Sequence, residues 1–282
     1  MGQWGGYGSG LGSFKTPKSV AVGSENNIFV VDEGNNRIQK FSRDGEFLMC
    51  WGERGGEVGQ FLRPVSVAAD RNGFVYVADS DHHSIKKFQD DGTFTTQWGE
   101  QGQGEGQFCY PRGITLFGDG TVYVADRRNH RVQKFDSEGR FLKKWGSEGR
   151  GDGQFNEPVD IATDDTGYVY VLDSNNSRIQ KFDAQGNFLG KWGGYGSGSV
   201  TFPWALGLAC DDEDFLYLAD TNNHRIQKFD TSGNPIAWWG GRGTDEGWFY
   251  FPNDVAVDAQ GFVYVADTEN HRIQKFEPIE RF

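Results

Sequence analysis

The segment from Pro252 to Phe276 reads PNDVAVDAQGFVYVADTENHRIQKF and contains the pattern that decides the fold. Its aspartate Asp267, at the end of the VAD motif, recurs at intervals of 47 residues through the whole chain. The six copies are Asp32, Asp79, Asp126, Asp173, Asp220 and Asp267. Six steps of 47 residues make 282, the full length, so residues 1–282 are predicted to form one repeat domain.

One repeat, residues 61–99, contains four short runs with strand character, at 65–69, 74–78, 85–88 and 93–98. The turns between them are rich in Asp, Asn and Gly, as in Asp70-Arg71-Asn72-Gly73, which is typical of tight hairpins. Four antiparallel strands per repeat are the unit of a β-propeller blade. The sequence therefore predicts an all-β, six-bladed propeller of four-stranded antiparallel blades.

The phase of the repeat at the two ends predicts how the ring closes. The last repeat runs out after its third strand at Phe276. The missing fourth strand, which ends in Trp-Gly in other repeats, is present at the start of the chain as Trp4-Gly5. The N-terminal strand should therefore complete the last blade and pair an edge that would otherwise stay open.

The repeat PxxVAVD…GxVYVADTxNHRIQKFDxxGxFxxxWG resembles the NHL repeat, and the resemblance covers all 282 residues. It implies the propeller fold. For function it implies a wide range, because similar propellers serve as protein-binding and RNA-binding domains of tripartite-motif proteins and as extracellular sensor domains of bacterial kinases. A diverged form is peptidylglycine amidating lyase.

Composition limits the class of protein. The formal net charge of −12 disfavours nonspecific binding to nucleic acid through the overall field, although a local basic patch would still allow it. No apolar run approaches the length of a membrane helix, so we expect a soluble monomer with no membrane partner. No signal peptide is visible, and the compartment stays open. The three cysteines form neither a pair motif nor an even set and are expected to be reduced.

We call the residues at one position of every repeat a column, and columns are expected to be scaffold because six copies spread around a ring. The six aspartates should bond the backbone of the turn that follows them. The arginine column should bridge neighbouring strands or blades, and Ser84 interrupts it. The histidine column holds His83, His130, His224 and His271, which lie in different blades and so should not share a metal. The glycine-rich segments should be flexible connectors between blades.

The first strands contain the column where propeller lyases and hydrolases usually place a metal or acid and base groups. Here it reads Ser19, Ser66, Gly113, Asp160, Gly207 and Asp254. Asp160 and Asp254 are weak candidates for holding a hard cation such as calcium. Solvated carboxylates at strand ends are the alternative that we favour. No nucleophile and base set is readable, so we expect no catalytic residues and no cofactor.

A binding site for a single partner should lie where the blades differ, on the face that carries the connectors and the Asp-x-x-Asn-His turns, which we call the top face. The predicted partner-binding residues are Lys18, Arg63, Tyr110, Arg112, Arg127, Arg128, Trp204 and Tyr250. On this face the first three repeats carry basic residues and the later ones acidic residues. The ring is therefore predicted to be electrically two-sided.

The function predicted from these features is a non-catalytic scaffold whose top face binds a peptide or protein. One alternative is an RNA-binding domain that uses the basic sector of blades 1 to 3. A second is a metal-dependent lyase or hydrolase at the central channel. A third is a recently amplified or engineered propeller with no selected ligand.

Overall fold

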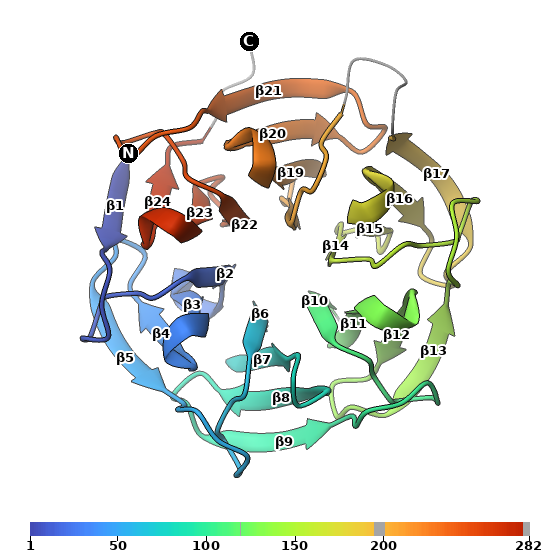
Figure 1. Cartoon of the computed structure of the whole chain (residues 1–282), viewed down its shortest axis with the longest axis horizontal. Coiled ribbons are helices and arrows are strands. Elements are labelled where there is room, and N and C mark those ends of the chain that lie inside the picture. The colour runs from blue at the N-terminus through green and yellow to red at the C-terminus, as the bar shows by residue number, and fades with distance from the viewer. Residues whose placement is uncertain (119, 195–200, 279–282) are drawn as a thin grey trace.

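The computed structural model describes residues 1–118, 120–194 and 201–278. Six antiparallel sheets of four strands stand around a central axis like the blades of a propeller (Figure 1). The predicted all-β, six-bladed architecture is confirmed. Within each blade the chain runs from the axis outward, so the first strand lines the centre and the fourth forms the rim.

The four strands of each blade recur at the 47-residue spacing. The innermost strands are β2 (Pro17–Val22), β6 (Pro64–Ala69), β10 (Pro111–Phe117), β14 (Asp160–Thr163), β18 (Gly207–Cys210) and β22 (Pro252–Val257). The second strands are β3 (Ile28–Asp32), β7 (Phe74–Asp79), β11 (Thr121–Asp126), β15 (Val169–Asp173), β19 (Phe215–Asp220) and β23 (Val263–Asp267). The third strands are β4 (Arg37–Phe41), β8 (Ser84–Gln89), β12 (Arg131–Phe135), β16 (Arg178–Phe182), β20 (Arg225–Asp230) and β24 (Arg272–Phe276). The outermost strands are β5 (Phe47–Trp51), β9 (Phe94–Trp98), β13 (Phe141–Trp145), β17 (Phe188–Gly193), β21 (Pro235–Gly240) and β1 (Gly2–Gly5).

Single-turn 3₁₀ helices join the second and third strands of five blades on the top face. They are η2 (Glu33–Asn35), η3 (Arg127–Asn129), η4 (Ser174–Asn176), η5 (Thr221–Asn223) and η6 (Thr268–Asn270), whereas η1 (Ser24–Asn26) lies at the other end of blade 1. Each top-face turn ends in a left-handed residue such as His130, with a φ of 52°. None of the helices within residues 1–118, 120–194 and 201–278 is long and apolar enough to cross a membrane.

The ring closes through the N-terminal strand, as predicted. Strand β1 pairs antiparallel with β24, and Trp4 lies opposite Ile273. The Trp4 ring packs against Tyr264 of its own blade, with ring centroids 6.3 Å apart, and reaches Phe41 of the next blade, with ring centroids 5.9 Å apart. The chain continues from β1 into blade 1, so this short strand ties the first blade to the last through strand pairing and side-chain packing.

The hydrophobic core lies between blades. Between blades 6 and 1, for example, Tyr264 and Ile273 of one sheet pack against Phe14, Val20 and Phe41 of the next. Burying one such aromatic side chain contributes roughly 1.5–3 kcal/mol. No blade can bury both of its faces alone, so the stacked ring is the stable unit.

The top face carries the connectors between blades, and the opposite face, which we call the bottom face, carries the other hairpin turns. The glycine-rich connectors are tied down by backbone hydrogen bonds. In the connector of blade 3, the Gly102 amide donates to the Phe108 carbonyl at 3.0 Å, and the Phe108 amide donates to Glu100 at 2.8 Å. The flexible connectors predicted from glycine content are thus held in place by their own backbone pairs.

Candidate functional site

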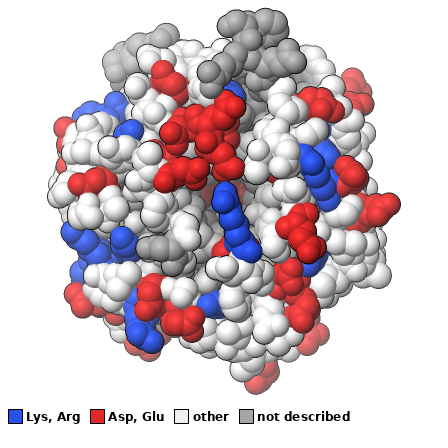
Figure 2. Space-filling model, turned by 180° about the vertical axis from the view of Figure 1, so that it is seen from behind, with Lys and Arg blue, Asp and Glu red and all other residues white. Residues whose placement is uncertain are grey.

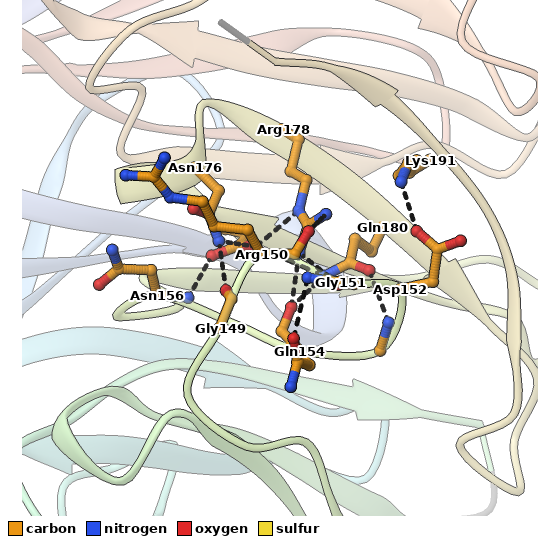
Figure 3. Close-up of polar contacts among 12 residues, drawn as sticks. Gly149, Arg150, Gly151, Asp152, Gln154, Asn156, Asn176, Arg178, Gln180 and Lys191 are labelled. Atoms are coloured by element: carbon orange, nitrogen blue, oxygen red, sulfur yellow. Dashed lines mark hydrogen bonds and ion pairs between the residues drawn. The ribbon is translucent and has the colours of Figure 1, made fainter.

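The aspartate column fastens connectors to their blades, and Figure 3 shows the polar contacts between the connector and the third strand of blade 4. In blade 4, Oδ2 of the fully buried Asp173 accepts hydrogen bonds from Asn176 and Arg178, at 2.9 and 2.8 Å. Its Oδ1 accepts the backbone amide of Asn156 at 2.7 Å. The backbone bond predicted for the following turn therefore goes to the connector before the blade, and the turn contributes the Asn176 side chain instead.

The arginine column completes this fastening, in line with the bridging role predicted for it. The Arg178 guanidinium donates to the backbone carbonyls of Arg150, Gly151 and Gln154 at 2.8, 2.9 and 2.7 Å (Figure 3). The same arrangement holds Arg37 and Arg131 in their blades. These columns are structural, because their polar atoms are used within the repeat.

Blade 2 departs from the pattern at three positions at once. Ser84 replaces the arginine, and its buried hydroxyl has no hydrogen-bond partner among the residues that the structure describes. Lys86 replaces the usual glutamine and forms an ion pair with Asp79 at 3.1 Å, and it donates to the Gln60 carbonyl. His82 replaces the usual asparagine, with its Nδ1 2.5 Å from Asp79 Oδ2. The lysine and the histidine thus take over part of the fastening.

The histidine column supports left-handed residues at the end of the next connector, close to the first strand of the following blade. Nδ1 of His83 accepts the backbone amide of Tyr110 at 3.0 Å, and Nδ1 of His130 accepts that of Glu157 at 3.1 Å. Burial lowers the pKa of His83 below its usual value, which favours the neutral ring that such a bond requires. Each ring serves a different connector, as expected for a polar turn residue.

The first-strand column that contains the two metal candidates joins the blades to one another. Ser19 accepts the Val67 amide of blade 2 at 3.1 Å, and Ser66 accepts the Ile114 amide of blade 3 at 3.4 Å. Each hydroxyl reaches the amide one position further along the next blade. The column therefore forms a belt of hydrogen bonds around the axis.

The belt continues through Asp160 and Asp254, which follow glycines. Asp160 accepts the Leu208 amide of blade 5 at 2.6 Å and also the amide of its own neighbour Ile161. A Cβ at Gly113 would lie 2.4 Å from Oδ1 of Asp160, so the glycine makes room for the carboxylate. Each aspartate thus supplies the acceptor that the preceding glycine lacks.

Asp254 repeats this arrangement at the closure of the ring. It accepts the Val20 amide of blade 1 at 3.0 Å and the Val255 amide at 2.8 Å, and Ser19 bonds to it as well. Burial raises the pKa of Asp254 to about 6 and raises that of Asp160 well above its usual range. The two weak metal candidates are therefore not the solvated strand-end carboxylates we favoured, because backbone amides occupy their oxygens in a buried site.

The predicted cationic residues gather on the top face, but acidic residues stand among them. Arg127 and Arg128 both pair with Glu157 of the next connector, at 2.5 and 2.8 Å. Lys18 lies 4.0 Å from Glu33. The prediction of a basic half and an acidic half did not anticipate these pairs, because it assigned charges by repeat number and Glu157 belongs to the repeat after the two arginines.

Arg63 and Tyr110, which were both predicted to bind a partner, contact one another between blades. The Arg63 guanidinium lies 5.8 Å from the centre of the Tyr110 ring and pairs with Asp81 at 3.1 Å. Tyr110 is 36% exposed. The structure therefore places a cation and an accessible aromatic ring together at the junction of blades 2 and 3.

The two remaining predicted aromatics differ in accessibility. Trp204 is 53% exposed and adopts a left-handed φ of 62°. Tyr250 is half-buried and stacks on His224, with ring centroids 5.5 Å apart and planes 15° apart. Trp204 is therefore available to a partner, whereas Tyr250 mainly packs the last connector.

Arg112 occupies the top end of the central axis. Its Nη2 donates to Oδ1 of Asn253 at 3.4 Å, and the two residues are 141 positions apart, which is three repeats. They therefore belong to opposite blades (Figure 1). The guanidinium extends across the ring, which sequence reasoning did not foresee.

A central cavity of about 430 Å³ extends from the level of Asp160 and Asp254 to the bottom face. Residues from all six innermost strands line it, and Asp165, Asp212 and Arg71 lie at its bottom opening. Figure 2 shows the acidic patch at this opening. The sequence signal was present in Asp164-Asp165 and Asp211-Asp212-Glu213-Asp214. The binding site predicted on the top face does not include this patch.

Comparison with a family model supplies the identity of the repeat. The model described as "NHL repeat" matches residues 14–41, 61–88, 108–135, 155–182, 202–229 and 249–276. The chain belongs to the NHL-repeat family. A search of curated proteins for relatives of this NHL-repeat chain found no match.

Solved structures similar to this NHL-repeat propeller include enzymes and a protein of unknown function. Virginiamycin B lyase from Staphylococcus aureus is 13% identical with a TM-score of 0.62, and the match covers 95% of this chain and 86% of that one. The gluconolactonase XC5397 from Xanthomonas campestris is 13% identical with a TM-score of 0.68, covering 92% and 86%. A Bacteroides thetaiotaomicron protein of unknown function is 17% identical with a TM-score of 0.74, covering 98% and 76%. At these identities the likeness establishes the propeller fold alone.

Proposed function

We propose that this NHL-repeat propeller is a non-catalytic binding module whose top face engages a peptide or a loop of a protein partner. The propeller fold is compatible with such a scaffold. The observation that carries the proposal is the exposure of blade-specific aromatic rings on the top face. Trp204 and Tyr110 are 53% and 36% exposed, and Arg63 lies over Tyr110. Aromatic and arginine side chains are enriched among the residues that dominate binding energy at protein interfaces.

The hydrogen bonds of the two carboxylates on the axis, Asp160 and Asp254, support binding rather than catalysis. A general acid or base needs an atom free to exchange a proton with substrate. Asp160 and Asp254 are instead engaged with backbone amides of their own and the neighbouring blade. Their raised pKa values follow from burial, which a structural role produces equally well.

A selection from a phage-displayed library of random peptides tests the proposal. Peptides selected on the wild-type protein should lose at least tenfold in affinity for the variants Trp204→Ala and Tyr110→Ala, measured by titration of a labelled peptide. The matched control is Tyr168→Ala, because Tyr168 is 38% exposed in the bottom-face turn region of blade 4. Its replacement should leave affinity unchanged.

Two results would contradict the proposal. The first is a set of peptides that bind equally well to the wild-type protein and to both top-face variants. The second is the absence of any selected peptide together with tight, salt-sensitive binding of single-stranded RNA, which would favour the nucleic-acid alternative.

A further inference from the structure

Arg112 lies at the top end of the central axis without a carboxylate of its own. Its only hydrogen bond among residues 1–118, 120–194 and 201–278 goes to the neutral amide of Asn253, at 3.4 Å. No ion pair within 4.0 Å involves it in that part of the chain. A guanidinium carries five N–H donors, so most of its bonding capacity is unused.

The nearest carboxylates on the axis do not fill this need. Asp160 and Asp254 attract Arg112 at longer range, but their oxygens accept backbone amides from Leu208 and Val20. Removing either carboxylate from the belt to pair with Arg112 would leave those amides unsatisfied. An unpaired buried amide costs about 1–3 kcal/mol. Arg112 therefore remains available for a ligand.

Other cations strengthen the positive potential at this point. Burial lowers the pKa of Arg112 to about 10, and Arg127 and Arg63 contribute by repulsion. Burial also lowers the pKa of Lys18, and Arg112 is among the charges that repel it. The site consequently favours an anion, because an anion would relieve the repulsion among these groups.

The charges around the rim indicate which kind of anion fits. Lys18 lies near Glu33, and Arg63 and Arg127 pair with Asp81 and Glu157. A continuous phosphate backbone would pass these carboxylates as it crossed the face, whereas one carboxylate side chain would meet only the centre. The formal net charge of −12 also opposes the approach of a polyanion.

We propose that Arg112, with Lys18 near it, binds one carboxylate side chain, from an aspartate or glutamate of the peptide or protein that docks on the top face. The inference rests on the proposed function and names the anchoring group of its partner. Arginine suits this role because its planar fork binds both oxygens of a carboxylate at once.

Titration with sodium glutarate tests the site directly. The probe is added to ¹⁵N-labelled protein while sodium chloride holds the ionic strength constant. NMR follows the Nε–Hε resonance of Arg112 in the wild-type protein, and the backbone amide resonances of Gly113 and Asn253 in every variant. We expect a saturable shift with a Kd of about 1–10 mM, the range of a weak single contact. Arg112→Met should abolish saturable binding, and Arg112→Lys should weaken it at least fivefold because the fork is lost.

The matched control is Arg140→Met, which removes an arginine from a bottom-face turn where its side chain is 80% exposed. Its glutarate affinity should equal that of the wild-type protein. Circular dichroism and thermal unfolding of every variant establish that the propeller stays folded. Saturable binding of glutarate that is unchanged in Arg112→Met would overturn the proposal, as would the absence of saturable binding to the wild-type protein.

Two further measurements distinguish a carboxylate ligand from a phosphate ligand, and the anion site from the proposed docking function. Inorganic phosphate or a uridine dodecamer that shifts the Arg112 resonance with tenfold higher affinity than glutarate would overturn the assignment to a carboxylate. Selected top-face peptides that lack acidic residues and bind Arg112→Met as tightly as the wild-type protein would contradict the carboxylate anchor. They would still support docking on the top face. Saturable glutarate binding at Arg112 without any selected peptide would support the anion site and count against the docking function.

Discussion

Asp254 in the last blade accepts a hydrogen bond from the backbone amide of Val20 in the first blade, at 3.0 Å. This bond joins the two ends of the repeat array beside the axis, while Trp4 joins them at the rim. The ring is thus closed on both its inner and outer edges. The inner closure belongs to a belt whose side chains come from Ser19, Ser66, Asp160 and Asp254.

Replacing Asp254 with alanine should destabilise the propeller, because it leaves the amides of Val20 and Val255 without acceptors. At about 1–3 kcal/mol for each of the two buried groups, we expect a loss of roughly 2–6 kcal/mol in the free energy of unfolding. Ser66→Ala removes one acceptor and should cost about half as much. Urea unfolding at pH 7 measures both. Equal stability of Asp254→Ala and wild type would show that the belt does not stabilise the closed ring.

The raised pKa of Asp254 predicts a pH dependence of stability. The unfolded chain releases this proton near pH 3.9, and the folded protein releases it at about 6. Between these values the folded form binds more protons, so the free energy of unfolding should fall as pH rises, by at most about 3 kcal/mol. The contribution is present below pH 4 and lost above pH 6. In Asp254→Asn, this part of the fall between pH 4.5 and 7 should disappear.

Asp183 provides a control of opposite sign for that measurement. Hydrogen bonds from the side chain and backbone of Asn187 lower the pKa of this exposed carboxyl. Its contribution should therefore be present above the unfolded pKa and lost as pH falls. Asp183→Asn should flatten the acid limb of the stability curve and leave the region near pH 6 unchanged. A loss of slope near pH 6 in this variant would show that the effect is not specific to the axis.

Restoring the common network in blade 2 should stabilise the protein. The triple variant His82→Asn, Ser84→Arg, Lys86→Gln rebuilds the set that fastens the other connectors. The new guanidinium at position 84 would donate hydrogen bonds to the backbone carbonyls of the blade 2 connector, as Arg131 does in blade 3. Charged hydrogen bonds contribute about 1.5–3 kcal/mol each, offset by the side-chain entropy of arginine, so we expect a net gain of about 1–3 kcal/mol.

The reverse change in blade 1 is the matched control for this experiment. Arg37→Ser removes bonds to the carbonyls of Ser9, Gly10 and Ser13 and should lower stability by a similar or larger amount. Chemical unfolding monitored by tryptophan fluorescence compares the two. A triple variant less stable than wild type would indicate that His82 and Lys86 fasten their connector as well as the arginine does.

Trp4 should matter more than its counterparts inside the chain. Trp4 and Trp98 make equivalent contacts with a phenylalanine of the following blade, each with ring centroids 5.9 Å apart. Both rings are half-buried, so replacing either with alanine should cost at most about 3–5 kcal/mol, the range for a fully buried aromatic. Trp4→Ala also loosens a strand of four residues that strand pairing, and not a hairpin turn, attaches to its blade, so its unfolding rate should rise more than that of Trp98→Ala. Stopped-flow unfolding measures the difference, and equal rates would argue against closure as the weak point.

The sequence predicts the fold well because local chemistry repeats. The 47-residue period, the Asx and Gly turns and the Trp4-Gly5 end agree on the same ring, and the structure has it in the same register. Strands of the second repeat differ from the prediction by a residue at some ends. Cross-strand hydrogen bonding decides such ends, as in the pairing of Asp79 with Ser84.

The site is less predictable because its contacts join residues of different repeats. Arg112 contacts Asn253, three repeats away along the chain. The alternation of glycine and aspartate in the belt is explained only by the structure, in which the Asp160 side chain occupies the space beside Gly113. Similarly, Arg127 and Glu157 were assigned to opposite halves of the ring, although adjacent blades bring them into contact. A count of charges by repeat contains no information about such neighbours.

The alternation of small and acidic residues in the belt limits how such an array can grow by duplication. Six copies of the second repeat would surround the axis with hydroxyls, each of which can both donate and accept a hydrogen bond. Six copies of the last repeat would crowd six carboxylates, each needing a glycine beside it that no copy would supply. Some repeats of this chain could therefore form a ring of identical copies, and others could not. The order of the blades is part of what allows the ring to close.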